Sequence, residues 1–246
     1  MGKVEQYRKV LRGLDNWDSY LLQGSGLPGP RGNIELARAV ADEGDEPLFL
    51  RYLEFDAKRA PTNSPEEFLV FCGVLGLGRL LAAGRHDALA SLRRSARDAR
   101  WRTREAVAMA LQRWGQVDMD ALLEEMEVWS QGELLEQRAA AAASCEPGLL
   151  GVPEHAQRAL KVLDAITDSL LSVQNRKSDA FRALRKGLGY CWSVAVAAEP
   201  ESGRALMEKW IAHHDPDVRW IMRNNLKKKR LHRMDAEWVA RCLTAL

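Results

Sequence analysis

The chain has 246 residues, of which 46% are hydrophobic and 28% are charged, a composition typical of a globular protein rather than a disordered one. A chain of this length can bury about three quarters of its unfolded surface, so it needs no disulfide or metal to stabilise its core. The 36 Lys and Arg residues against 34 Asp and Glu give a net charge of +2, which supplies no whole-molecule reason to expect a nucleic-acid partner.

The cysteines and the hydropathy pattern bear on the cellular compartment. Cys72, Cys145, Cys191 and Cys242 lie dozens of residues apart without a CxxC pair, which argues against a disulfide framework or a zinc module. The N-terminus lacks the apolar core of a signal peptide, and the sequence has no apolar run of 18 residues. We therefore expect a cytoplasmic monomer that does not span a membrane and binds no metal or cofactor.

From about residue 33 the apolar residues recur at spacings of three and four, and strict alternation is nearly absent. This pattern predicts an all-α protein with helices of roughly 10 to 20 residues. The breaks between helices are expected at the segment 24–32 and at Pro61, Pro65, Gly84, Gly115, Gly132, 147–153, Pro200 and Pro216. The Gly- and Pro-rich segment 24–32 lacks the Lys-Ser/Thr ending of a phosphate-binding loop and has no preceding strand, so we expect a turn there.

An approximate repeat begins near residue 98. Residues 98–111 open with Asp and continue with basic and then small aliphatic residues, residues 215–226 follow the same pattern, and residues 129–141 are a looser copy. Asp at a helix start, Pro in its first turn and Val-Arg before small residues resemble HEAT repeats. The resemblance implies a right-handed α-α superhelix, here a single C-shaped domain over 1–246, with divergent helices in 1–92 and repeats in 93–246.

The small net charge conceals an uneven distribution of basic and acidic residues along the sequence. Residues 93–115 carry 7 basic and 2 acidic groups, residues 116–154 carry 1 and 9, and residues 155–246 carry 17 and 10. Two basic segments thus flank an acidic one, and together they could form the two arms of a DNA-binding groove.

The most specific string is the tract 185–200, Arg-Lys-Gly-Leu-Gly-Tyr-Cys-Trp to Glu-Pro. It resembles the Arg-Lys-Ala-Ile-Gly-Trp helix of the AlkD-like DNA alkylation repair glycosylases, and the spacing of Trp129, Glu133 and Arg138 is similar to that family's Trp, Asp and Arg. The resemblance covers roughly residues 95–235. The chain differs from the family in having Glu133 for the Asp, Tyr190 for the Trp, and Ser193-Val194 for an Arg-Glu pair.

The resemblance implies excision of cationic N3- or N7-alkylated purines by a monofunctional glycosylase. Glu133 would stabilise the cationic sugar and orient a water, and Trp129 and Tyr190 would be the flanking aromatic residues. The alternative for Glu133 is a solvated acid favoured by the dipole at a helix start, and for the two aromatic residues it is packing between helices.

Phosphate contacts are expected from cations that open or line the repeat helices. The candidates are Arg100, Arg102, Arg104, Arg138, Arg185, Lys186, Arg223 and Lys227. The alternative for these residues is a solvated helix face or the internal Asp-to-Arg ladder of HEAT repeats. The run 227–230 is basic throughout and is also explained as a helix C-terminus favoured by the dipole.

Three hypotheses follow. The first is a protein that binds double-stranded DNA and excises alkylated bases, the second is a non-enzymatic binder of bent or branched DNA, and the third is a HEAT-repeat scaffold for other proteins. The third is favoured by the nine acidic residues of 116–154, which oppose a polyanion.

Overall fold

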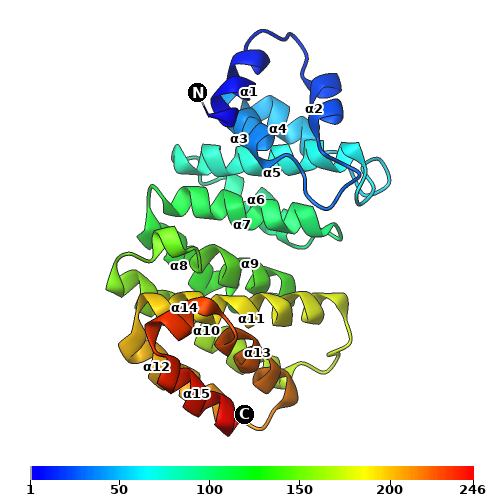
Figure 1. The fold of residues 1–246 in the computed structure, drawn as a ribbon. Helices are drawn as coiled ribbons and strands as arrows, with labels where there is room; N and C mark the ends of the chain where they lie inside the picture. The colour runs from blue at the N-terminus through cyan, green and yellow to red at the C-terminus, as the bar shows by residue number, and fades with distance from the viewer. Residues whose placement is uncertain (1) are drawn as a thin grey trace. The chain divides into compact units, whose positions relative to one another are not determined.

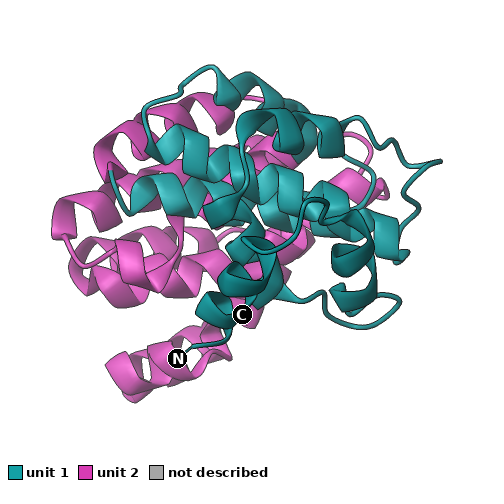
Figure 2. Cartoon of the chain, turned by 90° about the horizontal axis from the view of Figure 1, so that it is seen from above, with its two compact units in different colours: residues 1–117 teal, residues 118–246 magenta. Residues whose placement is uncertain are grey.

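The computed structural model describes residues 2–246, and these contain helices and connections but no β-strand (Figure 1). The all-α prediction is therefore confirmed. The helices form two compact units, one ending at Val117 and the other beginning at Asp118 (Figure 2). Residues 93–117, which the sequence groups with the later repeats, belong to the first unit.

The first unit is built around one long apolar helix, α5. Its helices are α1 (Lys3–Leu11), α2 (Asp18–Gly24), α3 (Ile34–Glu43), α4 (Glu46–Leu53), α5 (Pro65–Ala82), α6 (Ala88–Ala96) and α7 (Trp101–Gly115). Helices α3, α4 and α7 all pack on α5. Glycines allow the close approach, because a Cβ at Gly76 would lie 2.3 Å from Phe49 Cδ1 and one at Gly78 would lie 2.5 Å from Ala110 Cα.

The segment 24–32 contains no helix beyond Gly24, which agrees with the predicted turn. The backbone amide of Asn33 donates to the Ser25 carbonyl at 2.8 Å, and the Asn33 side chain then caps α3 by accepting from the Leu36 amide at 3.1 Å. Gly26 has a φ of 73°, a conformation that favours glycine. The turn thus ends at the N-cap of α3.

The second unit is built around α11. Its elements are α8 (Met119–Trp129), α9 (Leu134–Ser144), the 3₁₀ turn η1 (Pro147–Leu149), α10 (Pro153–Ser169), the 3₁₀ turn η2 (Leu170–Ser172), α11 (Asp179–Ala198), α12 (Pro200–Ile211), α13 (Pro216–Leu226), α14 (Lys229–Met234) and α15 (Ala236–Ala245). Helices α9, α10, α12, α13 and α14 all contact α11. The tract singled out in the sequence therefore forms the centre of this unit.

The two Asp residues that open the predicted repeats, Asp98 and Asp215, differ in their position relative to the helix start. The Asp215 side chain caps α13 by accepting from the Asp217 and Val218 amides at 2.9 and 3.1 Å, as the repeat pattern predicts. The other copy begins later, because α7 starts at Trp101 and Asp98 accepts from the Arg100 amide at 2.7 Å instead.

All four cysteines are buried and unpaired by disulfides. Burial raises the pKa of the Cys72 thiol well above its usual value, and burial together with a hydrogen bond to Cys191 does the same to Cys145. Burial raises the pKa of Cys242 to about 11. The thiols of Cys72, Cys145 and Cys242 are therefore packing groups and not nucleophiles.

Candidate nucleic-acid interface

Tyr190 is the exposed aromatic residue of α11, with 43% of its surface accessible. The Arg230 guanidinium donates to the Tyr190 hydroxyl at 2.6 Å, and its central carbon lies 4.7 Å from the ring centroid. The Lys228 Nζ lies 5.5 Å from the same centroid. Two cations thus contact an exposed aromatic ring, and the contact is favourable because the ring quadrupole attracts positive charge.

A buried amide fixes α13, the helix that precedes these cations, against α11. The Asn225 side chain is fully buried and donates to the carbonyls of Leu188 and Ile221, both at 2.8 Å, while its oxygen accepts from the Ser193 amide at 2.8 Å. It therefore joins α11 to α13 on both sides of Tyr190. A fully hydrogen-bonded buried amide stabilises one specific helix register.

The segments that carry Tyr190 and Lys228 contain further exposed cations. Lys186 is exposed one turn earlier on α11, and Lys227 and Lys229 are exposed beside Lys228. We call the set Lys186, Tyr190, Lys227, Lys228, Lys229 and Arg230 the Tyr190 surface.

The charge of this surface is not cancelled by acidic neighbours in the sequence. Residues 218–234 contain seven Lys and Arg and no Asp or Glu. The acids that flank this stretch are already engaged, since Asp217 pairs with Arg176 and Asp235 pairs with Arg204, each at 3.1 Å. The surface therefore carries a net positive charge toward solvent.

Trp129 does not have the role that the resemblance implies. Its side chain is fully buried at the end of α8, and its indole nitrogen donates to the Glu125 carboxylate at 2.6 Å. This prediction is wrong, because a ring with no accessible surface cannot contact DNA. The packing alternative holds for Trp129, as amphipathic helix spacing allows.

Glu133 is exposed and is the N-cap of α9. It forms a capping box with Glu136, whose carboxylate accepts from the Glu133 amide at 3.0 Å. The polar and cation–ring contacts of Tyr190 are, within residues 2–246, with Ser193, Lys228 and Arg230. The structure therefore gives Tyr190 and Glu133 no direct contact with each other.

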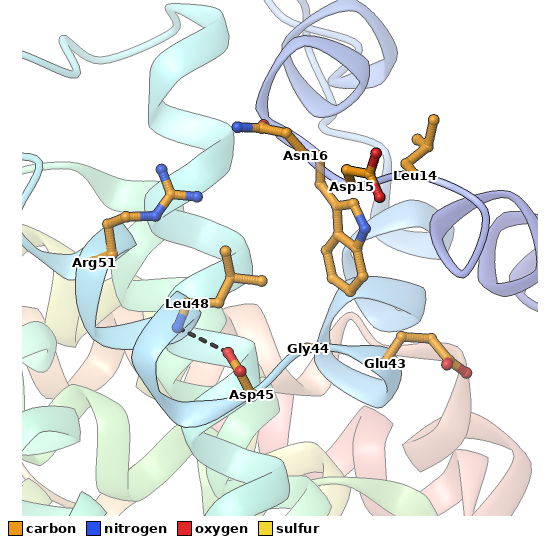
Figure 3. Close-up of a pocket in the computed structure, with 9 residues that line it drawn as sticks. Leu14, Asp15, Asn16, Glu43, Gly44, Asp45, Leu48 and Arg51 are labelled. Atoms are coloured by element: carbon orange, nitrogen blue, oxygen red, sulfur yellow. Dashed lines mark hydrogen bonds between the residues drawn. The ribbon is translucent and has the colours of Figure 1, made fainter.

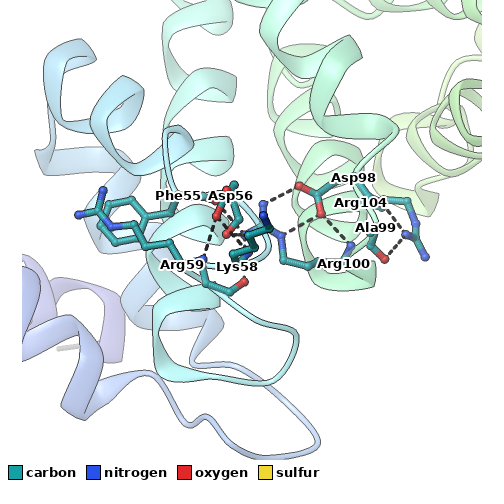
Figure 4. A network of polar contacts seen from close by, with 9 residues as sticks. Phe55, Asp56, Lys58, Arg59, Asp98, Ala99, Arg100 and Arg104 are labelled. Atoms are coloured by element: carbon teal, nitrogen blue, oxygen red, sulfur yellow. Dashed lines mark hydrogen bonds and ion pairs between the residues drawn. The ribbon is translucent and has the colours of Figure 1, made fainter.

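Two of the predicted phosphate-binding arginines are internal. Arg100 is 4% exposed and donates to the Asp98 carboxylate at 2.6 and 2.9 Å and to the carbonyls of Phe55 and Ala60 at 3.0 and 3.1 Å, as Figure 4 shows in part. Arg102 is 5% exposed and pairs with the buried Glu67 at 3.1 Å. Both predictions are wrong, because the loops before α5 and α7 supply acceptors to Arg100 and because Glu67 of α5 pairs with Arg102.

The other predicted cations differ in accessibility. Arg104 is half-buried and donates to the Asp98 and Ala99 carbonyls. Arg138 is half-buried and packs close to Gly187, where a hypothetical Cβ would lie 3.6 Å from the Arg138 Cγ. Arg185 lies 2.9 Å from Asp217 and 4.0 Å above the Trp220 ring, so it belongs to an internal ladder. Arg223 is exposed and donates to the Leu246 carbonyl at 2.6 Å. Lys186 and Lys227 are the two candidates within the Tyr190 surface.

Lys228 and Arg230 were missing from the predicted site. The basic run 227–230 signals a cationic segment, but no pattern in the sequence places it beside a tyrosine 40 residues earlier. That contact depends on how α14 folds back on α11.

A hollow of about 300 Å³ in the first unit is lined by charged groups (Figure 3). Each of the following has a structural partner: Asp45 caps α4 by accepting from the Leu48 amide at 3.0 Å, Glu43 binds Arg12 at 2.6 Å, and Arg51 binds Asp18 at 2.7 Å. Folding thus accounts for these charges.

Comparison with protein-family models, with curated proteins and with solved structures found no match to this chain. No helix within residues 2–246 is long and apolar enough to cross a membrane. The same residues contain no group of three His, Cys, Asp or Glu side chains placed to hold a metal ion. A functional assignment therefore depends on the geometry of the Tyr190 surface.

Proposed function

We propose that the second unit binds double-stranded DNA through the Tyr190 surface. The observation that carries this proposal is the exposed Tyr190 ring with Lys228 and Arg230 against it. The same segments of the chain carry the exposed Lys186, Lys227 and Lys229. Cations neutralise phosphates and release counterions, which supplies sequence-independent affinity. The aromatic ring adds a contact to sugar or base edges that a purely cationic patch lacks.

We also propose that the helices stack as HEAT-like repeats. The ion pairs of the second unit support this, because Arg176 and Arg185 both pair with Asp217 in the first turn of α13, at 3.1 and 2.9 Å. Such a ladder joins successive helix pairs in the manner expected from the repeat pattern. Stacked pairs of this kind expose one continuous face that can serve for binding.

The proposal is for binding, and excision of alkylated purines stays a prediction that depends on the family resemblance. With Trp129 in the core, one of the two implied aromatic contacts is lost. Glu133 is the exposed N-cap of α9, and a catalytic role for it depends on the resemblance alone. If the resemblance holds, methylated duplex DNA releases 3-methyladenine or 7-methylguanine, and Glu133→Gln abolishes the release without changing DNA affinity. Release at the spontaneous rate only would limit the function to binding.

Fluorescence anisotropy with a labelled duplex of about 20 base pairs tests the proposal. We expect binding at low salt and a fall in affinity as salt rises, with a slope set by the number of neutralised phosphates. The double variant Lys227→Glu/Lys229→Glu changes two exposed side chains, so it is expected to keep the fold. It should weaken binding at least tenfold and reduce the salt slope by about two.

The matched control is Lys161→Glu/Lys177→Glu, which makes the same charge change at exposed positions of the second unit outside the Tyr190 surface. Its affinity should stay within about threefold of the unmodified protein. Equal weakening by both double variants would mean that net charge alone drives binding. No binding at about 50 mM salt would refute the proposal and favour a protein-interaction scaffold.

A further inference from the structure

The first unit contains an apolar cavity of about 230 Å³ that the proposed function does not use. Its apolar lining comes from the 24–32 turn and from α3, α5 and α7, and consists chiefly of Leu27, Ile34, Phe68, Phe71, Trp101 and Met109. An engineered apolar cavity of about 150 Å³ stays dry and binds benzene. The present cavity thus has room for a ring larger than benzene and lies below the roughly 300 Å³ of drug-sized sites.

The walls of the cavity are fixed by a buried polar network. The Arg102 side chain donates to the Gly29 carbonyl at 2.5 Å and to the Asn63 side chain at 3.1 Å, and it pairs with Glu67, which is fully buried. This network ties the 24–32 turn to α5 and α7. A buried ion pair adds little stability compared with apolar packing, so its value here lies in holding the turn in place.

An aromatic residue stands exposed beside the cavity. Trp101 lines it and is 45% exposed, while the Arg102 guanidinium carbon lies 4.4 Å from the Trp101 ring centroid. By contrast Phe68 and Phe71 form a stacked pair with centroids 6.3 Å apart on the inner wall. The cavity therefore has aromatic surface both inside and at an accessible edge.

Arg31 supplies the cavity with a positive charge that can bind an anion. Three charged residues line it, namely Arg31, Arg102 and Glu105. Glu67 compensates Arg102, and Glu105 already has an interaction partner. Arg31 is exposed on the turn and forms no ion pair within residues 2–246, so it is the lining charge left to meet a ligand.

We propose that this cavity binds a small aromatic carboxylate, with the ring against the apolar wall and the carboxylate at Arg31. The apolar lining supplies affinity through burial of the ring, and Arg31 supplies selectivity for the anion. The site lies in the first unit, so it is independent of the DNA-binding proposal.

Calorimetric titration with 2-naphthoate and its neutral analogue 2-naphthamide tests the proposal. We expect 2-naphthoate to bind at one site per chain and 2-naphthamide to bind about fivefold more weakly. Arg31→Glu should weaken 2-naphthoate by about fivefold or more and leave 2-naphthamide unchanged. Arg38→Glu, the same change at an exposed position of α3 outside the cavity, should affect neither probe.

Met109→Trp fills the cavity and should abolish binding of both probes, with circular dichroism verifying that the variant is helical. Because Arg31 is exposed, the Arg31→Glu variant keeps the test decisive even if Met109→Trp does not fold. Absence of saturable 2-naphthoate binding, or binding that survives in a folded Met109→Trp variant, would overturn the site. Equal affinities for the two probes, unaffected by Arg31→Glu, would overturn the assignment of the ligand as an anion.

Discussion

Trp129 and Tyr190 are large aromatic residues that the sequence places on helices of one unit, yet they differ in what surrounds them. Trp129 is fully buried with its indole nitrogen hydrogen-bonded, while Tyr190 is 43% exposed and contacts two cations. Burial of the whole side chain makes Trp129 part of the core. The accessible ring makes Tyr190 available to a partner.

These surroundings predict opposite effects of substitution to alanine. Trp129→Ala leaves a cavity and should lower the free energy of unfolding by about 3–5 kcal/mol, whereas Tyr190→Ala should lower it by about 1 kcal/mol or less. Tyr190→Ala should instead weaken DNA binding. Urea unfolding and duplex anisotropy measure the two effects, and a loss of stability at Tyr190 comparable to that at Trp129 would contradict the distinction.

At this scale the sequence predicts which aromatic residues lie on helices but not which of them are accessible to solvent. The spacing on α8 and α11 is amphipathic in both cases, so Trp129 and Tyr190 satisfy the same pattern. The contact of α14 with α11 places cations beside the exposed Tyr190 ring, and the Asn225 side chain fixes α13 against α11.

At the scale of an element, α13 depends on its first residue. The Asp215 carboxylate caps the helix and also pairs with Arg176 at 2.6 Å. Asp215→Ala should lower the free energy of unfolding by about 1–3 kcal/mol, because it removes a cap and an ion pair together. Asp179→Ala is the control, since its ion pair with Arg182 is exposed and should be worth under about 0.5 kcal/mol. Thermal unfolding of both variants checks the difference.

The turn 24–32 depends on the buried pair of Arg102 and Glu67. Arg102→Met leaves the Glu67 carboxylate buried and unpaired, so it should cost about 3–5 kcal/mol in the free energy of unfolding. The double variant Arg102→Met/Glu67→Met removes both charges and should be more stable than Arg102→Met alone. A double variant that is less stable than Arg102→Met in urea unfolding would contradict this account.

The two elements differ in how far the sequence could predict them. The cap of α13 is local, so Asp followed by Pro and Val-Arg is sufficient to place the helix start. The partners of Arg102 lie 35 and 73 residues away, at Glu67 and Gly29, and no local pattern connects them. For the same reason the sequence predicts phosphate contacts for Arg100 and Arg102, whereas both side chains bind groups of their own chain.

At the scale of the whole molecule, stability should depend on pH through Glu43. Hydrogen bonds from Arg12 and Arg8 lower the pKa of Glu43 from 4.5 to about 2. Because the folded pKa lies below the unfolded one, this stabilisation is complete above pH 4.5 and is lost as the pH falls toward 2. Glu43→Gln should therefore destabilise the protein at pH 7 and flatten the pH dependence between about 4.5 and 2, as urea unfolding at a series of pH values would show. An unchanged pH profile would contradict the assignment.

Spacing alone predicts the all-α class, because helices of both units bury faces with a period of three to four residues. Charge segregation predicts a cationic C-terminal segment but not its neighbours. Tyr190 meets Lys228 and Arg230 across about 40 residues, and Asn225 joins α11 to α13 across 37, so the surface exists only in the folded unit.

The buried cysteines give the native protein a practical property. Thiolates react with maleimides, and burial keeps Cys72 and Cys145 protonated and out of reach of solvent. A single cysteine introduced at an exposed position, such as Lys229→Cys, would therefore be the site that a fluorescent maleimide labels. The emission of that dye would report directly on contact between the surface and DNA, without removal of any native cysteine.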